Sequence, residues 1–197
     1  MKLRKILFAL FAVFALSSLT SCNYNSLVEK QQNVDQAWAQ VENQYQRRAD
    51  LIPNLVNTVK GYAQHESSTL ESVTRARAGL TKAYEAAQSA EATPENIEQY
   101  QQAQGNLKGA LDIYVNAVKE AYPDLKANTN FIDLQTQLEG TENRISTERM
   151  RYTEAVKDYN TSIKKFPTNI YAGWFGFKEK PQFKAEAGAQ KAPVVEF

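Results

Sequence analysis

Apolar residues recur along most of this chain at alternating steps of three and four. Between residues 27 and 62 the stripe contains one arginine, and its members are Leu27, Val34, Trp38, Val41, Tyr45, Arg48, Ile52, Leu55, Val59 and Tyr62. The same spacing resumes at Leu70, Val73, Leu80, Tyr84 and Ala87. This is the period of an amphipathic helix, and no stretch of the sequence shows the strict alternation of a half-buried strand. The pattern therefore predicts an all-α protein without a sheet.

Two further helices have their own boundary signals. Thr93-Pro94-Glu95 is typical of an N-cap followed by a proline and an acid in the first turn, and Tyr122-Pro123 is a stop signal. After the polar stretch 124–130, a last long helix is predicted up to Pro167. Its apolar positions are Phe131, Leu134, Leu138, Ile145, Tyr152, Val156, Tyr159, Ile163 and Phe166. Narrow apolar stripes bury themselves on one another, so we expect an antiparallel up-down bundle of about four long helices.

The first corner of this bundle has three interpretations. Asp50 could cap a helix that holds Pro53 in its first turn, where the missing N–H costs little. Alternatively, Ser68 and Glu71 form a capping box, which places the corner later. The third option is one long helix kinked at Pro53. The stripe keeps its phase across Pro53 and so favours a kink over a sharp turn, although a helix of that length leaves its first half short of partners.

The N-terminus, MKLRKILFALFAVFALSSLTSC, has the three parts of a secretory signal: a basic start, the apolar core Ile6–Leu16 and small residues at the end. The core is shorter than the roughly 20 residues that a membrane-spanning helix needs. Leu19-Thr20-Ser21-Cys22 looks like a bacterial lipobox, in which the cysteine is lipidated on sulfur and becomes the first mature residue. Residues 1–21 are therefore predicted to be a lipoprotein signal peptide, and Cys22, the one cysteine of the chain, a lipid attachment site.

A lipid on Cys22 would place the protein in the cell envelope, anchored to the periplasmic or outer face of a bacterial membrane. Each buried CH₂ contributes about 0.8 kcal/mol, and two or more acyl chains suffice for stable anchoring. The alternatives are a free thiol at Cys22 or an uncleaved membrane helix. We expect residues 22–183 to form the helical bundle with an aromatic C-terminal segment, and residues 184–197 to be a flexible tail.

Composition and motifs disfavour several classes of function. The chain has 23 Lys and Arg against 22 Asp and Glu, and three of the basic residues precede the apolar core, so the mature chain has no basic footprint for nucleic acid. His65, the one histidine, lacks the second histidine of a zinc helix motif, and neither a nucleophile elbow nor a glycine-rich phosphate loop occurs. We therefore expect no enzyme activity, cofactor, metal or small-molecule substrate. A non-enzymatic scaffold for unidentified envelope proteins is favoured over two alternatives, an enzyme of unrecognised type and a protein that binds or remodels lipid directly.

Polar residues occupy positions of the apolar stripes where the spacing predicts apolar ones, namely Arg48, Thr141 and Glu148. In an up-down bundle the first and last helices are antiparallel, and facing positions sum to about 193 when their free ends meet. Arg48 then lies within a turn of Glu142 and Glu148. We predict an ion pair from Arg48, or from its neighbour Arg47, to one of these acids. Its favoured role is to set register and orientation, as buried polar residues do in coiled coils, with a functional site as the alternative.

The same topology returns the end of the chain to the side of Cys22. The candidate membrane interface there consists of Tyr171, Trp174, Phe175, Phe177, Lys178 and Lys180. Aromatic rings rest among lipid head groups, and lysines meet anionic lipid. The favoured alternative is that these rings fold back and cap the core, because exposed apolar patches of this size are uncommon. Both interpretations could hold for different rings.

Four ordered motifs carry a family resemblance. ADLIPNLVNTVKGYAQHE at 49–66, preceded by two arginines, closely resembles the central motif of the LemA family of bacterial envelope proteins. The other motifs are YNSLV at 24–28, YPDLKAN at 122–128, and FPTNI at 166–170 followed by FGF at 175–177. The resemblance implies a membrane-anchored helical bundle with no established biochemical activity. This chain departs from the family at Thr153, where Asn is usual, and in carrying a lipobox in place of a plain membrane helix.

Overall fold

The computed structural model describes the backbone of residues 2–61, 67–88 and 94–183 and the side chains of residues 24–61, 68–88 and 95–183. In chain order the elements are α1 (Lys2–Lys60), α2 (Ser67–Gln88), α3 (Pro94–Ala121), the 3₁₀ helix η1 (Pro123–Ala127), α4 (Thr129–Lys164) and the short α5 (Thr168–Tyr171). No strand occurs in these three ranges. The predicted all-α fold with four long helices is confirmed.

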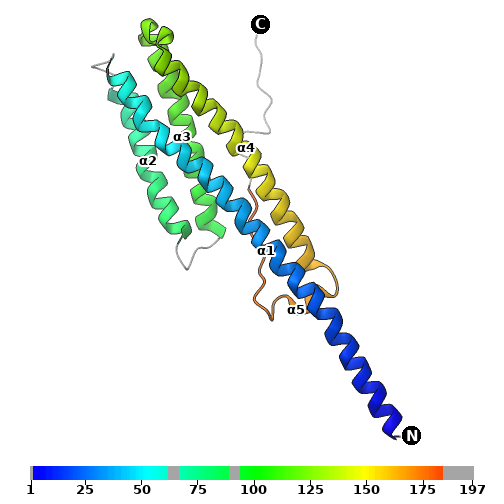
Figure 1. The fold of residues 1–197 in the computed structure, drawn as a ribbon. Coiled ribbons are helices and arrows are strands. Elements are labelled where there is room, and N and C mark those ends of the chain that lie inside the picture. Colours follow the sequence, from blue (N-terminus) through cyan, green and yellow to red (C-terminus); the bar gives the residue numbers. More distant parts are fainter. Residues whose placement is uncertain (1, 62–66, 89–93, 184–197) are drawn as a thin grey trace, which may run out of the picture.

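The helices form two antiparallel pairs of unequal length. α1 packs along α4, and α2 packs along α3 as a hairpin. Figure 1 shows that the hairpin covers only the half of the α1–α4 pair that lies farther from the N-terminus. A four-helix bundle therefore occupies that half alone. In the other half α1 and α4 continue as a pair, and the N-terminal part of α1 projects beyond the end of α4.

The core consists of the residues that the helical spacing singled out. Its buried members include Leu27, Val34, Val41, Tyr45, Ile52, Leu55 and Val59 from α1, Val73 and Leu80 from α2, Leu107, Leu111, Tyr114 and Val118 from α3, and Phe131, Ile145, Tyr152, Val156 and Tyr159 from α4. Removal of this apolar surface from water, at roughly 25 cal/mol per Å², is what holds the helices together. The core runs through both halves of the molecule without a break.

The first corner follows Lys60, and α1 runs through Pro53 without interruption. The interpretation in which Asp50 caps a new helix is therefore wrong. The structure has one long helix, and α2 begins at Ser67, where the capping-box alternative placed the corner. Pro53 removes one hydrogen bond from the helix because it has no N–H. α1 continues past it because apolar neighbours on both sides of Pro53 are buried in the core.

α1 and α4 are paired close to the predicted register. Arg48 faces Glu142, and the ring of Trp38 contacts that of Tyr152 with centroids 5.2 Å apart. Facing positions thus sum to about 190, which differs from the expected value by less than one helical turn.

The YPDLKAN motif forms the corner between α3 and α4. Leu125, within the stretch expected to be polar, is fully buried in η1. Asn128 then caps α4, and its Oδ1 accepts a hydrogen bond from the Phe131 N–H at 3.0 Å. This contact satisfies one of the N–H groups that have no partner inside the helix. The motif therefore combines an apolar anchor with a helix start.

Beyond the hairpin, the α1–α4 pair is covered by the C-terminal strap, which we define as residues 172–183. Asn160 of α4 holds the strap at Lys180: Asn160 Nδ2 donates to the Lys180 carbonyl at 2.9 Å, and the Lys180 N–H donates to Asn160 Oδ1 at 2.9 Å. The Tyr152 hydroxyl donates to the carbonyl of Pro181 at 2.9 Å, and Lys180 Nζ lies 3.0 Å from Asp35 Oδ1 on α1. The strap is thereby bonded to both helices that it covers.

Trp38 marks the boundary between the two halves. Its ring contacts Tyr100 of α3 on the hairpin side and Phe183 at the end of the strap. The Arg149 guanidinium lies 4.6 Å from the centroid of the Phe183 ring. The strap therefore begins to cover α1 at the level where the hairpin stops. It supplies the partners that the first half of a long α1 was expected to lack.

Replacement of Asn160 with Ala is expected to lower the free energy of unfolding by about 1–2 kcal/mol, because two backbone groups of Lys180 lose their partner. Urea unfolding gives the change, and hydrogen exchange at the Lys180 amide should accelerate. The matched control is Asn143→Ala, an exposed asparagine on the same helix, for which a change within about 0.5 kcal/mol is expected. Equal stability of the two variants with unchanged exchange at Lys180 would contradict this role of Asn160.

Candidate functional site

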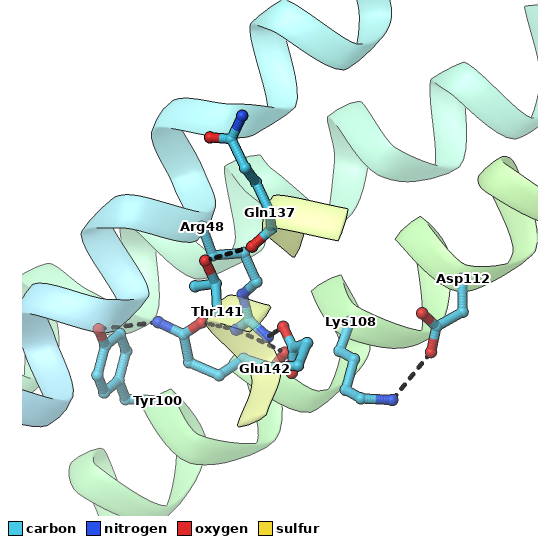
Figure 2. Close-up of polar contacts among 8 residues, drawn as sticks. Arg48, Tyr100, Lys108, Asp112, Gln137, Thr141 and Glu142 are labelled. Atoms are coloured by element: carbon cyan, nitrogen blue, oxygen red, sulfur yellow. Dashed lines mark hydrogen bonds and ion pairs between the residues drawn. The ribbon is translucent and has the colours of Figure 1, made fainter. Parts of the chain in front are cut away.

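A buried arginine lies at the centre of the four-helix half. Arg48 of α1 is 2% exposed and reaches between α3 and α4 (Figure 2). Its Nη1 donates to Glu142 Oε1 of α4 at 2.7 Å. Its Nη2 donates to the backbone carbonyl of Gln104 on α3 at 3.2 Å and also to the side-chain Oε1 of Gln104. The predicted ion pair from Arg48 is thus formed with Glu142, and one guanidinium joins three helices.

Gln104 extends this network to a tyrosine. Gln104 Nε2 donates to the Tyr100 hydroxyl at 2.9 Å. Three rings from two helices surround Tyr100: those of Trp38 and Tyr45 on α1 and that of Tyr84 on α2. Burial raises the pKa of Tyr100 well above the usual range, and the hydrogen bond from Gln104 opposes this only in part. We call Arg48, Gln104, Glu142 and Tyr100 the polar centre.

One atom of the polar centre, and one atom of the residue four positions before Arg48 on α1, have no hydrogen-bond partner. Arg48 Nε and Gln44 Oε1 are buried and make no hydrogen bond. Thr141, a buried polar residue of the α4 stripe, does not join the polar centre. Its hydroxyl donates to the Gln137 carbonyl of its own helix at 2.7 Å. The polar centre is therefore costly to assemble, and loss of one member would leave further buried groups unsatisfied.

The other two predicted members of the polar seam lie elsewhere. Arg47 is exposed on α1, so the ion pair uses Arg48 alone. Glu148 pairs with Arg151 of its own helix at 2.9 Å rather than with α1. Glu42, six residues before Arg48 on α1, is half-buried. This burial raises its pKa against the lowering effect of hydrogen bonds from Trp38 and Gln88.

Glu142 is the member of the polar centre that reaches the surface. It lines a groove of about 560 Å³ between α3 and α4. Leu111 and Leu138 contribute apolar surface to this groove, and Lys108 and Asp112 form an ion pair at its rim, with Nζ and Oδ2 2.9 Å apart (Figure 2). Charged side chains of both signs line the groove. Among the side chains that the structure describes, no three His, Cys, Asp or Glu gather as metal ligands.

The structure divides the predicted membrane interface into two sets. Tyr171 and Phe177 are buried, so their assignment to the interface is wrong and the capping interpretation holds for them. Trp174 and Phe175 are exposed, Trp174 by 82%. Tyr171 is buried as part of α5, whereas a turn at Gly176 separates Phe175 from Phe177. The φ of +81° at Gly176 suits a residue without Cβ, and Phe177 points inward while Phe175 stays outside.

The two predicted lysines are divided in the same way. Lys178 is exposed, whereas Lys180 is bound to Asp35 as part of the strap. Phe166, expected in the apolar stripe of the last helix, is instead 80% exposed here, and Ile170, which the prediction omitted, is 55% exposed. Some of these residues therefore cap the core, and others form an exposed apolar surface.

The predicted lipid attachment site lies close to this end of the bundle. Cys22 falls within α1, two residues before Tyr24, whose ring contacts Phe175 and Phe177 with centroids 5.3 and 5.6 Å away. The side chain of Cys22, together with His65 and the tail 184–197, lies outside what the structure describes, so lipidation stays a prediction. Over the part of the chain that is described, no helix carries an apolar stretch long enough to cross a membrane.

Three side chains that make hydrogen bonds in the polar centre or to the strap were not predicted from the sequence. Gln104 falls between Tyr100 and Leu107 at steps of four and three, so its place in the α3 stripe was detectable as a polar interruption. The hydroxyl of Tyr100 gave no signal, because a tyrosine in a stripe is satisfied by packing alone. Asn160 was also undetectable, because its partner is backbone rather than a side chain.

A comparison with known protein families matches the LemA family over residues 37–197. The chain belongs to the LemA family. The match includes the buried arginine, Gln104, Glu142 and the whole strap. It confirms the resemblance that the four motifs carried.

Curated relatives agree with this assignment. Protein LemA of Metamycoplasma hominis is 24% identical over 151 residues, covering 75% of this chain and 63% of the relative. Magnetosome protein MamQ 2 of Paramagnetospirillum magneticum is 27% identical over 187 residues, covering 87% of this chain and 68% of the relative. Magnetosome protein MamQ of Magnetospirillum gryphiswaldense is 24% identical with the same coverage. This chain thus spans less than two thirds of the length of the Metamycoplasma protein.

Replacement of Arg48 with Met is expected to lower the free energy of unfolding by about 3 kcal/mol, because the buried Gln104 carbonyl groups lose their donor and Glu142 loses its counter-charge. Glu142→Gln keeps an acceptor oxygen and should cost about 1–2 kcal/mol. In a double-mutant cycle the combined loss should be smaller than the sum of the single losses. Chemical denaturation provides all four values.

The control for this cycle is Arg47→Met, which removes the adjacent exposed arginine and should change stability by less than about 0.5 kcal/mol. Exchange of the two charges, in Arg48→Glu combined with Glu142→Arg, should recover part of the stability that each single swap loses. Strict additivity in the cycle, together with no recovery in the swap, would rule out the Arg48–Glu142 coupling.

Proposed function

We propose that this LemA family protein is a lipoprotein of the bacterial cell envelope, attached to a membrane through Cys22. In this proposal it is a non-enzymatic scaffold that holds a helical bundle at a fixed orientation to the membrane and offers it to envelope proteins. Two features support it: the lipobox-like sequence that ends at Cys22, and the continuous course of α1 from that residue into the bundle.

The observation that carries the proposal is the continuity of α1. One uninterrupted helix extends from the predicted anchor through the core to the far corner of the bundle. Leu27, five residues after Cys22, is already buried in the core, and Tyr24 packs on the strap. A lipid on Cys22 would therefore act on the rigid body directly, without a flexible linker. At 1.5 Å per residue, Lys60 lies about 57 Å along the helix from Cys22.

The polar centre supports a structural role over a catalytic one. An enzyme built from Arg, Glu and Tyr would need these groups to converge on an open cleft. Here Arg48 is enclosed, its donors are directed at Gln104 and Glu142, and rings surround Tyr100. A guanidinium engaged in this way is well suited to fixing helix register.

The anchor is tested by the mass of the mature protein. We expect the purified membrane form to begin at Cys22 and to carry a diacylglyceryl group on its sulfur. Globomycin, which inhibits lipoprotein signal peptidase, should leave residues 1–21 in place, and Cys22→Ser should abolish the lipid. A mature protein that retains residues 1–21, or that has an unmodified thiol at Cys22, would contradict the anchor.

The scaffold role is tested by loosening the anchor without removing it. A flexible Gly/Ser insert between Cys22 and Tyr24 should preserve lipidation but alter which proteins are captured by a photo-crosslinking residue at Ile113, an exposed position of α3. An insert of the same length in the tail 184–197 is the control and should leave the captured set unchanged. An identical set in both variants would count against a fixed orientation as the basis of function.

A further inference from the structure

Four large apolar side chains are exposed together at the anchor end of the bundle. They are Phe166, Ile170, Trp174 and Phe175, which we call the apolar tip, and they are 80%, 55%, 82% and 60% exposed. Phe166 precedes α5, Trp174 and Phe175 lie in the turns that follow, and Ile170 lies within α5. Thr168 and Tyr171 occupy its inner side and are buried. Large apolar side chains thus lie exposed on and beside α5, where a protein surface is normally polar.

The apolar tip lies beside the predicted lipid. Phe175 contacts Tyr24, which is two residues from Cys22 and therefore about 3 Å farther along α1. Figure 1 shows α5 at the point where α1 leaves the bundle toward its N-terminus. Any bilayer that held a lipid on Cys22 would meet the apolar tip before any other part of the bundle.

Positive charge surrounds the apolar tip. Lys164 and Lys165 precede Phe166, and Lys178 follows the turn; all three are exposed. Glu179 is the one acid between residues 162 and 183, and it pairs with Lys164 at 2.8 Å. A cluster of rings with lysines around it is the composition of a surface that sits among anionic head groups.

We infer that the apolar tip is an interfacial lipid-binding surface, which inserts its side chains among the head groups of an anionic phospholipid bilayer. The inference rests on the proposed anchor at Cys22 for its location and adds a second, non-covalent contact with the same membrane. The lipid chain prevents escape, whereas the tip fixes tilt and rotation. Two points of attachment orient a rigid bundle where a single one would leave it free to swivel.

Trp174 is a built-in probe of this contact. The lipidated full-length protein with Trp38→Phe, which leaves Trp174 as the one tryptophan, is reconstituted into vesicles of phosphatidylglycerol and phosphatidylcholine. We expect Trp174 emission to shift to shorter wavelength, to lose most of its quenching by iodide, and to gain quenching by lipids that carry a quencher near the head group. Circular dichroism and thermal unfolding verify that Trp38→Phe keeps the fold.

A matched variant places the tryptophan at the far end. Ile113, exposed on α3, becomes the site of the single tryptophan in Ile113→Trp combined with Trp38→Phe and Trp174→Phe. Its emission should stay water-like in the same vesicles. The lysines are tested by Lys165→Glu with Lys178→Glu, because each lysine near an anionic surface is worth about fivefold in binding. Lipid quenching of Trp174 in this variant should fall to the level seen with phosphatidylcholine alone.

The outcomes separate this inference from the proposed anchor. Lipid on Cys22, detected by mass spectrometry, with water-like and iodide-accessible Trp174 in vesicles would overturn the lipid-binding tip and leave the anchor intact. An unmodified Cys22 with Trp174 still quenched when vesicles are added would overturn the anchor and support the tip. A shift of Trp174 that depends on protein concentration and not on lipid would assign the apolar tip to a contact between copies of this chain, and would also overturn the inference.

Discussion

The apolar stripe of α1 is longer than the hairpin that can cover it, and most of the architecture follows from this mismatch. The stripe extends from Leu27 to Val59, about 48 Å along the helix, whereas the 22 residues of α2 span about 33 Å. α4 covers one side of α1 along this stripe. The remaining apolar surface needs a second cover, and the strap supplies it from the boundary at Trp38 downward. The C-terminal segment is therefore part of the fold.

The register between α1 and α4 is the second constraint. The strap is bonded to both helices, so one helix cannot slide along the other without breaking these bonds. Asn160 and Tyr152 bind the strap to α4, and Asp35 binds it to α1. These contacts can coexist only if the two helices are aligned. The Arg48–Glu142 pair enforces that alignment from inside the bundle, since a shift of one turn would leave a buried guanidinium without its carboxylate. The polar centre thus acts on the far half of the molecule through the α1–α4 pair.

Sequence periodicity predicted the helices, their antiparallel order and the Arg48–Glu142 pair because each depends on spacing along one helix or on simple geometry between two. It failed where a choice depended on a third element. Pro53 could not be assigned to a helix interior without knowing that the strap covers α1. Tyr171 and Phe177 could not be separated from Trp174 and Phe175, because all four are aromatic. Tyr171 is buried on the inner side of α5, and the turn at Gly176 lets Phe177 point inward. Asn160 binds backbone, which leaves no trace in side-chain patterns.

The central claim is that one continuous helix, fixed at its foot by lipid and by the apolar tip, holds the bundle upright. Neutron reflectometry of the lipidated protein on a supported bilayer measures the height of the protein layer directly. The account predicts a layer that extends roughly 55–60 Å from the head groups, the length of α1 beyond Cys22 at 1.5 Å per residue. A layer of about 20–25 Å, the thickness of two packed helices lying on the membrane, would contradict it.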